Sequence, residues 1–217
     1  MSSTTLLSKT NDSLRTYSRA DAVVVYKTKE RFGGLSNMAS GYPLKVNGVK
    51  LLTSEALYQA CRFPHLPNIQ REIIIQHSPM TAKMKSKPHR KDSRIDWDKV
   101  RTQVMRWCLR VKLAQNYEEF GRLLLATQDH PIVEQSRKDD FWGAKVTGIA
   151  DETLVGQNIL GRLLMELREM LKEDFEGELK SVPPLSIPEF LLLGRPIGTI
   201  SECPETREAD PKQTSFL

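Results

Sequence analysis

Residues 96–112 read DWDKVRTQVMRWCLRVK and carry the longest helical pattern in the first part of the chain. The apolar residues of this stretch recur at spacings of four, three, one and three: Val100, Val104, Trp107, Cys108 and Val111. Because an α-helix turns once in about 3.6 residues, this series places all its members on one face. The stretch therefore predicts a helix that begins after Asp96 and has one buried stripe.

Two shorter helices are predicted before this stretch, each from a cap and a proline. Thr53 or Ser54 can cap a helix over 55–63 that ends before a proline. Ser78 can cap a second helix, which has a proline at its first position and runs to about Lys87. These signals indicate a helical region on the N-terminal side of residues 96–112.

Two further helices are predicted after it. Asn116 followed by Glu119 resembles a capping box in front of an apolar series. Residues 158–172 show the strongest pattern, with seven apolar residues on one face: Ile159, Leu160, Leu163, Leu164, Leu167, Met170 and Leu171. This period predicts an amphipathic helix.

The predicted strands are short and lie mainly near the N-terminus. The run 22–26 is β-branched and reads as a buried strand, and the glycines of 33–37 force a turn after it. Asn47-Gly48 separates two short strands within 42–52 and is a strong hairpin signal. A further strand is expected at 132–133. The sequence therefore predicts an α+β fold, mainly helical, with a small sheet formed by N-terminal strands.

The ends of the chain differ in composition from its middle. Residues 1–20 are polar and without periodicity, so we expect a flexible arm. Residues 21–175 are expected to form a single domain. Residues 176–217 hold six of the twelve prolines and more acidic than basic residues, which is typical of a tail. Its apolar segment 187–193 is expected to dock on the body, and the last fifteen residues are expected to be disordered.

Composition excludes several classes of protein. With 217 residues, 39% of them hydrophobic and 27% charged, the chain is neither collagen-like, a coiled coil nor fully disordered. No apolar run reaches the roughly 20 residues that span a bilayer, and the first twenty residues lack a secretory signal. The three cysteines, Cys61, Cys108 and Cys203, include no CxxC pair. We expect a soluble, cytoplasmic protein that does not bind a membrane.

The net charge of +5 is distributed unevenly. Residues 83–112 hold eleven Lys or Arg against three Asp, a local net of +8, whereas residues 172–217 hold five basic against nine acidic residues. A phosphate-facing surface for nucleic acid is one interpretation of the basic segment. A solvated helix flank is the other.

Common catalytic motifs are absent from the sequence. It contains no P-loop, no Rossmann glycine fingerprint, no HExxH and no Gly-X-Ser-X-Gly. The four histidines are scattered and form no i,i+4 pair, so neither a metal nor a cofactor is expected.

Three local patterns could carry chemistry, although each also has a purely structural interpretation. Glu55 and Gln59 share one face of a mostly apolar helix, where the glutamate could equally serve the helix dipole. The segment 139–143, DDFWG, could stack a base or plug the core. The segment 156–158 precedes a helix whose free N–H groups could bind an anion or be plainly capped.

The order of these patterns resembles the NADAR family over roughly residues 23–172. The resemblance rests on segments that follow one another along the chain: Leu35-Ser36-Asn37, Ser54-Glu55 with Gln59 and Phe63, Ser78-Pro79-Met80 with Ala82-Lys83, Trp97 with Val104-Met105-Arg106, Val133-Glu134, Asp140 with Trp142-Gly143, and Gly156-Gln157-Asn158-Ile159-Leu160-Gly161. It implies hydrolysis of an N-glycosidic bond between a base-like group and a phosphorylated ribose.

The resemblance also implies roles for individual residues. Lys83 occupies the lysine position of the motif and is expected to be the nucleophile, with Glu55 moving protons. The alternative route has no covalent step, and in it Glu55 orients water or stabilises the cation. Trp142 is expected to stack on a base, Asn37 and Asp140 to bind ribose hydroxyls, and Arg106 or Lys87 to meet a pyrophosphate. The full set of expected substrate-binding residues is Asn37, Gln59, Lys87, Arg106, Asp140, Trp142, Gly143 and Asn158.

Within the family, two enzymatic activities and one binding role remain open. The first is removal of ADP-ribose from guanine in DNA, as an antitoxin partnered with an ADP-ribosyltransferase toxin, with DNA bound through residues 83–112. The second is an N-glycosidase for phosphorylated riboflavin intermediates, and the third is a non-catalytic ADP-ribose-binding module. The chain departs from the family pattern at Ala56-Leu57, at Ser86-Lys87 and over 144–155. These departures affect substrate choice, and the first activity is preferred.

Overall fold

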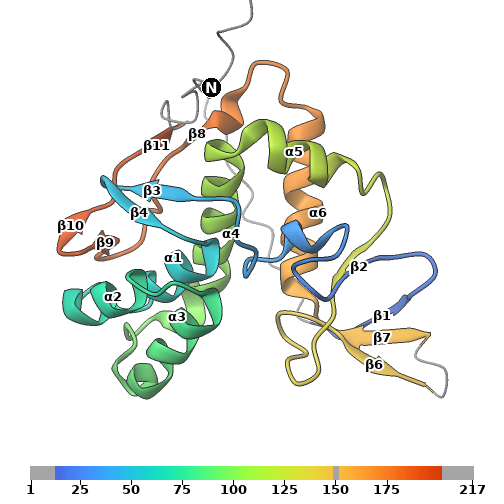
Figure 1. Cartoon of the computed structure of the whole chain (residues 1–217), viewed down its shortest axis with the longest axis horizontal. Helices are drawn as coiled ribbons and strands as arrows, with labels where there is room; N and C mark the ends of the chain where they lie inside the picture. The colour runs from blue at the N-terminus through green and yellow to red at the C-terminus, as the bar shows by residue number, and fades with distance from the viewer. Residues whose placement is uncertain (1–12, 149–151, 202–217) are drawn as a thin grey trace, which may run out of the picture.

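The long helix α4 (Trp97–Gln115) forms the centre of the molecule (Figure 1). A computed structural model describes residues 13–148 and 152–201. Helices α1 (Ser54–Cys61), α2 (Pro67–Ile74) and α3 (Pro79–Ser86) lie on one side of α4, and α6 (Ile159–Lys172) lies on the other. The α+β class is confirmed, and the predicted central helix is present.

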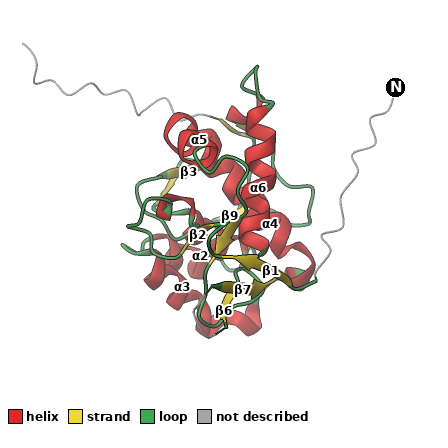
Figure 2. Cartoon of the chain, turned by 90° about the vertical axis from the view of Figure 1, so that its right-hand side faces the viewer, coloured by secondary structure: helices red, strands yellow, loops and turns green. Residues whose placement is uncertain are grey.

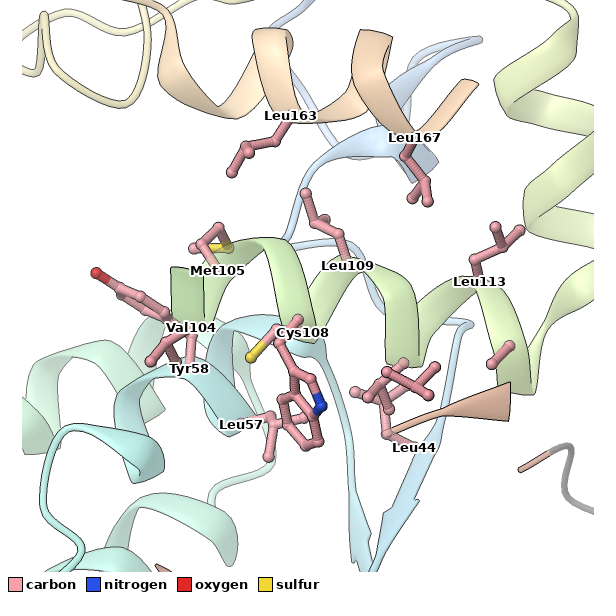
Figure 3. Packing of buried hydrophobic residues seen from close by; sticks show 14 of the residues in the cluster. Leu44, Leu57, Tyr58, Val104, Met105, Cys108, Leu109, Leu113, Leu163 and Leu167 are labelled. Carbon is pink, nitrogen blue, oxygen red and sulfur yellow. The ribbon is translucent and has the colours of Figure 1, made fainter. Parts of the chain in front are cut away.

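The buried face of α4 is wider than the single stripe that the sequence predicts. Figure 3 shows that Val104 and Cys108 approach α1, whereas Met105 and Leu109 approach Leu163 of α6. Every labelled α4 side chain in that view is at most 2% exposed. Two-sided packing therefore makes α4 a core helix rather than an amphipathic surface helix.

The caps of α1 and α3 form as the sequence predicts. Thr53 Oγ1 accepts a hydrogen bond from the Ala56 N–H at 3.2 Å, and Ser78 Oγ accepts one from the Thr81 N–H at 3.1 Å. All eight residues of α1 are buried. Helix α2, which the sequence analysis does not predict, lies between α1 and α3 in the chain and packs against both. A 3₁₀ segment, η2 (Lys87–Asp92), follows α3.

Helix α5 (Tyr117–Leu125) is present, but the predicted capping box is wrong. Asn116 makes no side-chain cap bond, because its Nδ2 donates to the Lys112 carbonyl at 3.0 Å and to the Pro43 carbonyl at 3.3 Å. Asn116 also ends α4, so its side chain serves the carbonyls at that terminus instead.

The predicted hairpin is present, and the two other predicted strands pair with each other. Strands β3 (Leu44–Val46) and β4 (Val49–Leu51) pair through Asn47 and Gly48, whose φ angles of 52° and 80° fit a type I′ turn. Strand β2 (Val23–Val25) pairs in parallel with β5 (Ile132–Glu134). The 3₁₀ turn η1 (Gly33–Leu35) is the element that follows β2 in the chain.

Strand β1 (Arg15–Ser18) corrects the prediction of a flexible arm over residues 1–20. It pairs antiparallel with β7 (Thr153–Gly156), which also pairs with β6 (Lys145–Thr147). This sheet lies at the lower end of α6 (Figures 1 and 2). Residues 1–12 lie outside the described residues. The pairing joins segments more than a hundred residues apart, so no local pattern reveals it.

The C-terminal segment up to residue 201 packs onto the body. It comprises η3 (Glu178–Lys180), the pair β8 (Ser181–Val182) with β11 (Ile200–Ser201), and the pair β9 (Leu191–Leu192) with β10 (Arg195–Pro196). Phe190 meets Trp107 with ring centroids 4.9 Å apart, and Leu192 is fully buried. The expected disorder of the last fifteen residues concerns a stretch outside the described residues.

No helix in the described part of the chain is long and apolar enough to cross a membrane.

Candidate active site

One cavity of about 340 Å³ collects most of the residues singled out from the sequence. Its walls come from the loop after η1, from α1, α3 and α4, and from the segment 134–143. The volume lies within the range of small-molecule sites. The predicted residues that line it are Asn37, Glu55, Gln59, Lys83, Trp142 and Gly143.

Glu55 is buried, and its carboxylate accepts hydrogen bonds from two other predicted residues, Asn37 and Gln59. Its Oε1 accepts a hydrogen bond from Gln59 Nε2 at 2.9 Å, one helical turn along α1, and its Oε2 accepts one from Asn37 Nδ2. Burial raises the pKa of the Glu55 carboxyl, while the Lys83 charge and these two amide donors lower it. Asn37 and Gln59 thus hold the carboxylate in addition to lining the cavity.

Lys83 lies on α3 and lines the same cavity as Glu55. It is half-buried, and its charge acts on two carboxyl groups, those of Glu55 and Glu134. The cap at Ser78 and the proline after it fix the start of α3, so Lys83 stands on a helix rather than on a loop.

Glu134 is a site residue for which the sequence analysis gives no role. It ends β5 and lines the cavity, and its Oε2 is buried without a hydrogen-bond partner among the described residues. Burial and the nearby Glu55 charge raise the pKa of Glu134 to about 8, against the lowering effect of Lys83, a Ser36 hydrogen bond and Lys112. Its place at the end of a buried strand, in the segment Val133-Glu134 of the family pattern, is the signal that could have identified it.

Asn158 positions Glu134 and lies outside the cavity, which corrects its predicted role in substrate binding. It is fully buried, and its Nδ2 donates to the Ile132 carbonyl at 2.8 Å. Its Oδ1 accepts from the Glu134 N–H at 3.0 Å. Asn158 adopts a left-handed conformation with φ of 50°, which asparagine tolerates better than most residues. Its side chain therefore ties the start of α6 to β5.

Of the two interpretations of segment 156–158, the structure does not support the anion site. The N–H groups of residues 157–160 donate to the carbonyls of residues 140–143, at 2.7 Å for Gln157 to Asp140 and 3.0 Å for Leu160 to Trp142. These donors are consumed by the protein itself. They fix the loop that carries the aromatic pair Phe141 and Trp142.

Aromatic rings form one wall of the cavity. Trp142 meets Tyr58 with centroids 5.5 Å apart, and Tyr58 meets Trp97 at 5.0 Å. Asp139 Oδ1 accepts the N–H groups of Phe141 and Trp142 at 3.0 and 2.9 Å. Trp142 is thus half-buried against Tyr58 while part of it lines the cavity, so the two interpretations of this residue are both partly true.

Three predicted substrate-binding residues lie outside the cavity. Asp140 is exposed and pairs with Lys145 Nζ at 2.6 Å, which lowers the pKa of that carboxyl; its neighbour Asp139 lines the cavity instead. Lys87 is exposed at the start of η2. Arg106 Nε donates to Glu166 Oε1 at 2.8 Å on α6, because α4 turns its residue 106 away from the cavity.

The basic segment 83–112 is not one surface, which corrects the interpretation drawn from charge. Lys112 is fully buried and donates to the carbonyls of Gly34 at 2.5 Å and Ser36 at 3.0 Å. Burial lowers its pKa to about 7. Arg94 is buried as well and pairs with Asp96 at 2.5 Å. The exposed cations of the segment are Lys85, Lys87, Arg90, Lys91 and Lys99.

Within the described ranges, no three His, Cys, Asp or Glu side chains are arranged so that they could hold a metal ion.

Comparisons with known proteins identify the class and then the family. N-glycosidase YbiA of Escherichia coli is 40% identical over 146 residues, which cover 67% of this chain and 86% of that protein. An N-glycosidase of Nostoc punctiforme is 29% identical over 152 residues, covering 69% and 92%. The NMR structure of E. coli YbiA has a TM-score of 0.58 at 36% identity and covers 72% of this chain and 92% of that one. The class is that of hydrolases acting on N-glycosyl bonds.

The match that identifies the family covers most of the chain. The NADAR domain matches residues 24–172, and the chain belongs to this family. A riboflavin biosynthesis protein of Vibrio vulnificus is 35% identical over 153 residues, which cover 70% of this chain and 39% of that protein. The predicted resemblance is confirmed.

Proposed function

We propose that this chain hydrolyses a ribosyl N-glycosidic bond, with Lys83, Glu55 and Glu134 as its catalytic residues. The observation that carries the proposal is their convergence: a lysine and two buried carboxyl groups, from three separate elements, line one cavity and act on one another electrostatically. A cleavage of this kind needs a proton for the leaving base and a group that receives the anomeric carbon.

The two carboxyl groups suit opposite tasks. Glu134, with a pKa of about 8, holds its proton at neutral pH and can donate it to the leaving base. Glu55 accepts hydrogen bonds from two amide donors, which stabilise its ionised form and suit it to accept a proton. Burial raises the pKa of both carboxyl groups, and it is the two amide donors on Glu55 that distinguish its environment from that of Glu134, as in acid–base pairs.

Lys83 acts as the nucleophile in this proposal. Its neutral amine bonds to C1 of the ribose as the C1–N bond to the base breaks, and the base nitrogen keeps that electron pair and takes the Glu134 proton. Glu55 removes a proton from the new C1–N group and returns it to the ring oxygen as the ring opens to a Schiff base. Water then adds to C1, its proton passes to Glu134, and the released aldehyde closes to ribose while Lys83 leaves as the amine.

The preferred substrate is ADP-ribose linked to guanine in DNA, which would make the protein an antitoxin to an ADP-ribosyltransferase toxin. Support comes from the aromatic wall, which offers rings for a base, and from exposed lysines on α3 and η2, the two elements that contribute Lys83 and Arg90 to the cavity. A phosphorylated riboflavin intermediate is the second candidate, favoured by the name of the Vibrio relative. A non-catalytic ADP-ribose-binding module would not need the two carboxyl groups beside Lys83.

An activity panel tests the proposal. Purified chain is given a guanine-ADP-ribosylated oligonucleotide, ADP-ribosylated protein and the pyrimidine precursor of riboflavin, and release is followed by mass. We expect release from the oligonucleotide, with a KM that rises with salt because phosphate contacts release counterions. Release only from the riboflavin precursor would reassign the substrate. No release from any of the three would contradict the proposed activity.

A further inference from the structure

Three arginines line the cavity that holds Glu55, and none of them was singled out from the sequence. Arg62 follows α1, Arg90 lies in η2 and Arg101 lies on α4. Within the described part of the chain, none of the three guanidinium groups forms an ion pair. This differs from Arg94 and Arg106, which are paired with carboxylates.

Aromatic faces hold two of these guanidinium groups in place. Arg101 Cζ lies 3.8 Å from the centroid of the Phe141 ring. Arg62 Cζ lies 5.2 Å from the Trp97 ring, and its Nε donates to Ser93 Oγ at 2.6 Å. A guanidinium stacked by its face keeps its N–H groups in the plane for an oxyanion, with little rotational freedom left to lose. Two rigid donor forks are therefore built into the cavity wall.

The three charges also repel one another. Burial lowers the pKa of Arg62, and the charges of Arg90 and Arg101 lower it further, whereas Tyr58 and Asp98 raise it. The fold thus keeps these three cations together in one cavity, whose lining also includes Asp98 and Asp139. An anionic ligand would remove this repulsion, because its charge would interact favourably with all three.

We propose that Arg62, Arg90 and Arg101 form the subsite for the phosphate or diphosphate ester carried by the ribose. This proposal rests on the proposed function for the identity of the ribose. It moves the phosphate contact from Arg106 and Lys87, which the sequence suggested, to residues in the same cavity as Lys83. A monophosphate and a diphosphate share the required chemistry.

Calorimetric binding to the full-length chain tests the subsite without requiring turnover. The probes are ADP-ribose, ribose 5-phosphate and adenosine, which carry a diphosphate, a monophosphate and no phosphate. We expect a phosphate-bearing probe to bind at least tenfold tighter than adenosine. Arg62→Gln and Arg101→Gln should each lower the affinity for that probe by about tenfold to a hundredfold, as expected for the loss of hydrogen bonds to a charged group. The affinity for adenosine should not change.

Matched variants separate a subsite from a general loss of charge or of folding. Arg106→Gln removes the same charge from the same helix outside the cavity and should bind like the wild type. Arg101→Lys keeps the charge but loses the fork, so it should bind with intermediate affinity. Thermal unfolding of each variant verifies that it is folded.

The outcomes distinguish this subsite from the proposed activity. Failure of the wild-type chain to bind either phosphate-bearing probe, or equal binding by wild type, Arg62→Gln and Arg101→Gln, would overturn the subsite. If phosphate-dependent binding is lost in both variants while the activity panel shows no release, the subsite stands and the N-glycosidase proposal fails. The probe that binds tighter reports whether a monophosphate or a diphosphate is preferred.

Discussion

Glu55 and Glu134 differ in what surrounds their oxygens, and this difference defines the proposed chemistry. Both oxygens of Glu55 accept amide hydrogen bonds, whereas Glu134 Oε2 is buried without a partner among the described residues. A carboxyl oxygen without a donor favours the protonated form, since an unpaired buried charge is costly. This environment therefore suits Glu134 to act as the general acid of the proposed reaction.

The pH profile tests this role of Glu134. Because the group must be protonated to donate, kcat/KM of the wild type should fall as the pH rises through about 8. Glu134→Gln should lack this alkaline limb and lose about 10²- to 10⁴-fold in kcat/KM. Glu72→Gln, an exposed glutamate on α2, is the matched control and should keep the wild-type profile. An unchanged profile in Glu134→Gln would exclude Glu134 as the acid.

The same residue should affect the free energy of unfolding. An acid with a raised pKa in the folded state binds its proton more tightly there than in the unfolded chain, where the pKa is about 4.3. Its contribution to stability is complete below about pH 4.3 and is lost as the pH rises through about 8. Urea titrations should show a weaker decline over this window in Glu134→Gln than in the wild type.

At the scale of elements, the contact between α6 and β5 fixes the site. The first turn of α6 lies so close to β5 that a Cβ added at Gly161 would be 2.1 Å from the Ile132 carbonyl oxygen. Across the same strand, a Cβ added at Gly143 would be 2.4 Å from the Glu134 carbonyl oxygen. Two glycines thus allow the helix and the aromatic loop to hold Glu134 from both sides.

Alanine at position 161 tests this close approach. Gly161→Ala should lower the free energy of unfolding by about 1–3 kcal/mol, because the backbone of β5 has to move. The control is Gly198→Ala, where the added methyl group meets nothing within 4 Å, and it should change stability by less than about 0.5 kcal/mol. Equal unfolding midpoints for the two variants would contradict the close packing of α6 on β5.

Elements with a strong local pattern are predictable from the sequence, and those defined by distant partners are not. Helices α4 and α6 follow from apolar period, and the β3–β4 hairpin follows from Asn47-Gly48. Helix α2 is not predicted from the sequence, because only Gln70 and Ile73 of its eight residues are buried and two positions define no helical repeat of apolar residues. Strand β1 is not predicted because its pairing with β7 is non-local, whereas β6 and β7 pair locally within the stretch 144–155, to which the sequence analysis assigns no strand.

At the scale of the whole molecule, the sequence identifies most residues of the cavity but not the arginines that line it. Asn37, Glu55, Gln59, Lys83, Trp142 and Gly143 are brought together as the family resemblance implies. Charge counting fails because it treats residues 83–112 as one surface, whereas α4 sends Arg106 to α6 and buries Lys112 in the core. The three arginines of the cavity come from the residue after α1, from η2 and from α4, which only the folded chain brings together.

Reaction of Lys83 with C1 of the ribose inside this cavity is the central step of the proposed activity. Sodium borohydride, added during turnover of whichever panel substrate the chain cleaves, reduces the Schiff base to a stable amine. We predict a ribosyl adduct that peptide mass mapping assigns to Lys83. The adduct should be absent from Lys83→Ala and undiminished in Lys85→Ala, an exposed lysine on the same helix. An active wild-type chain that yields no adduct, or an adduct that persists in Lys83→Ala, would contradict it.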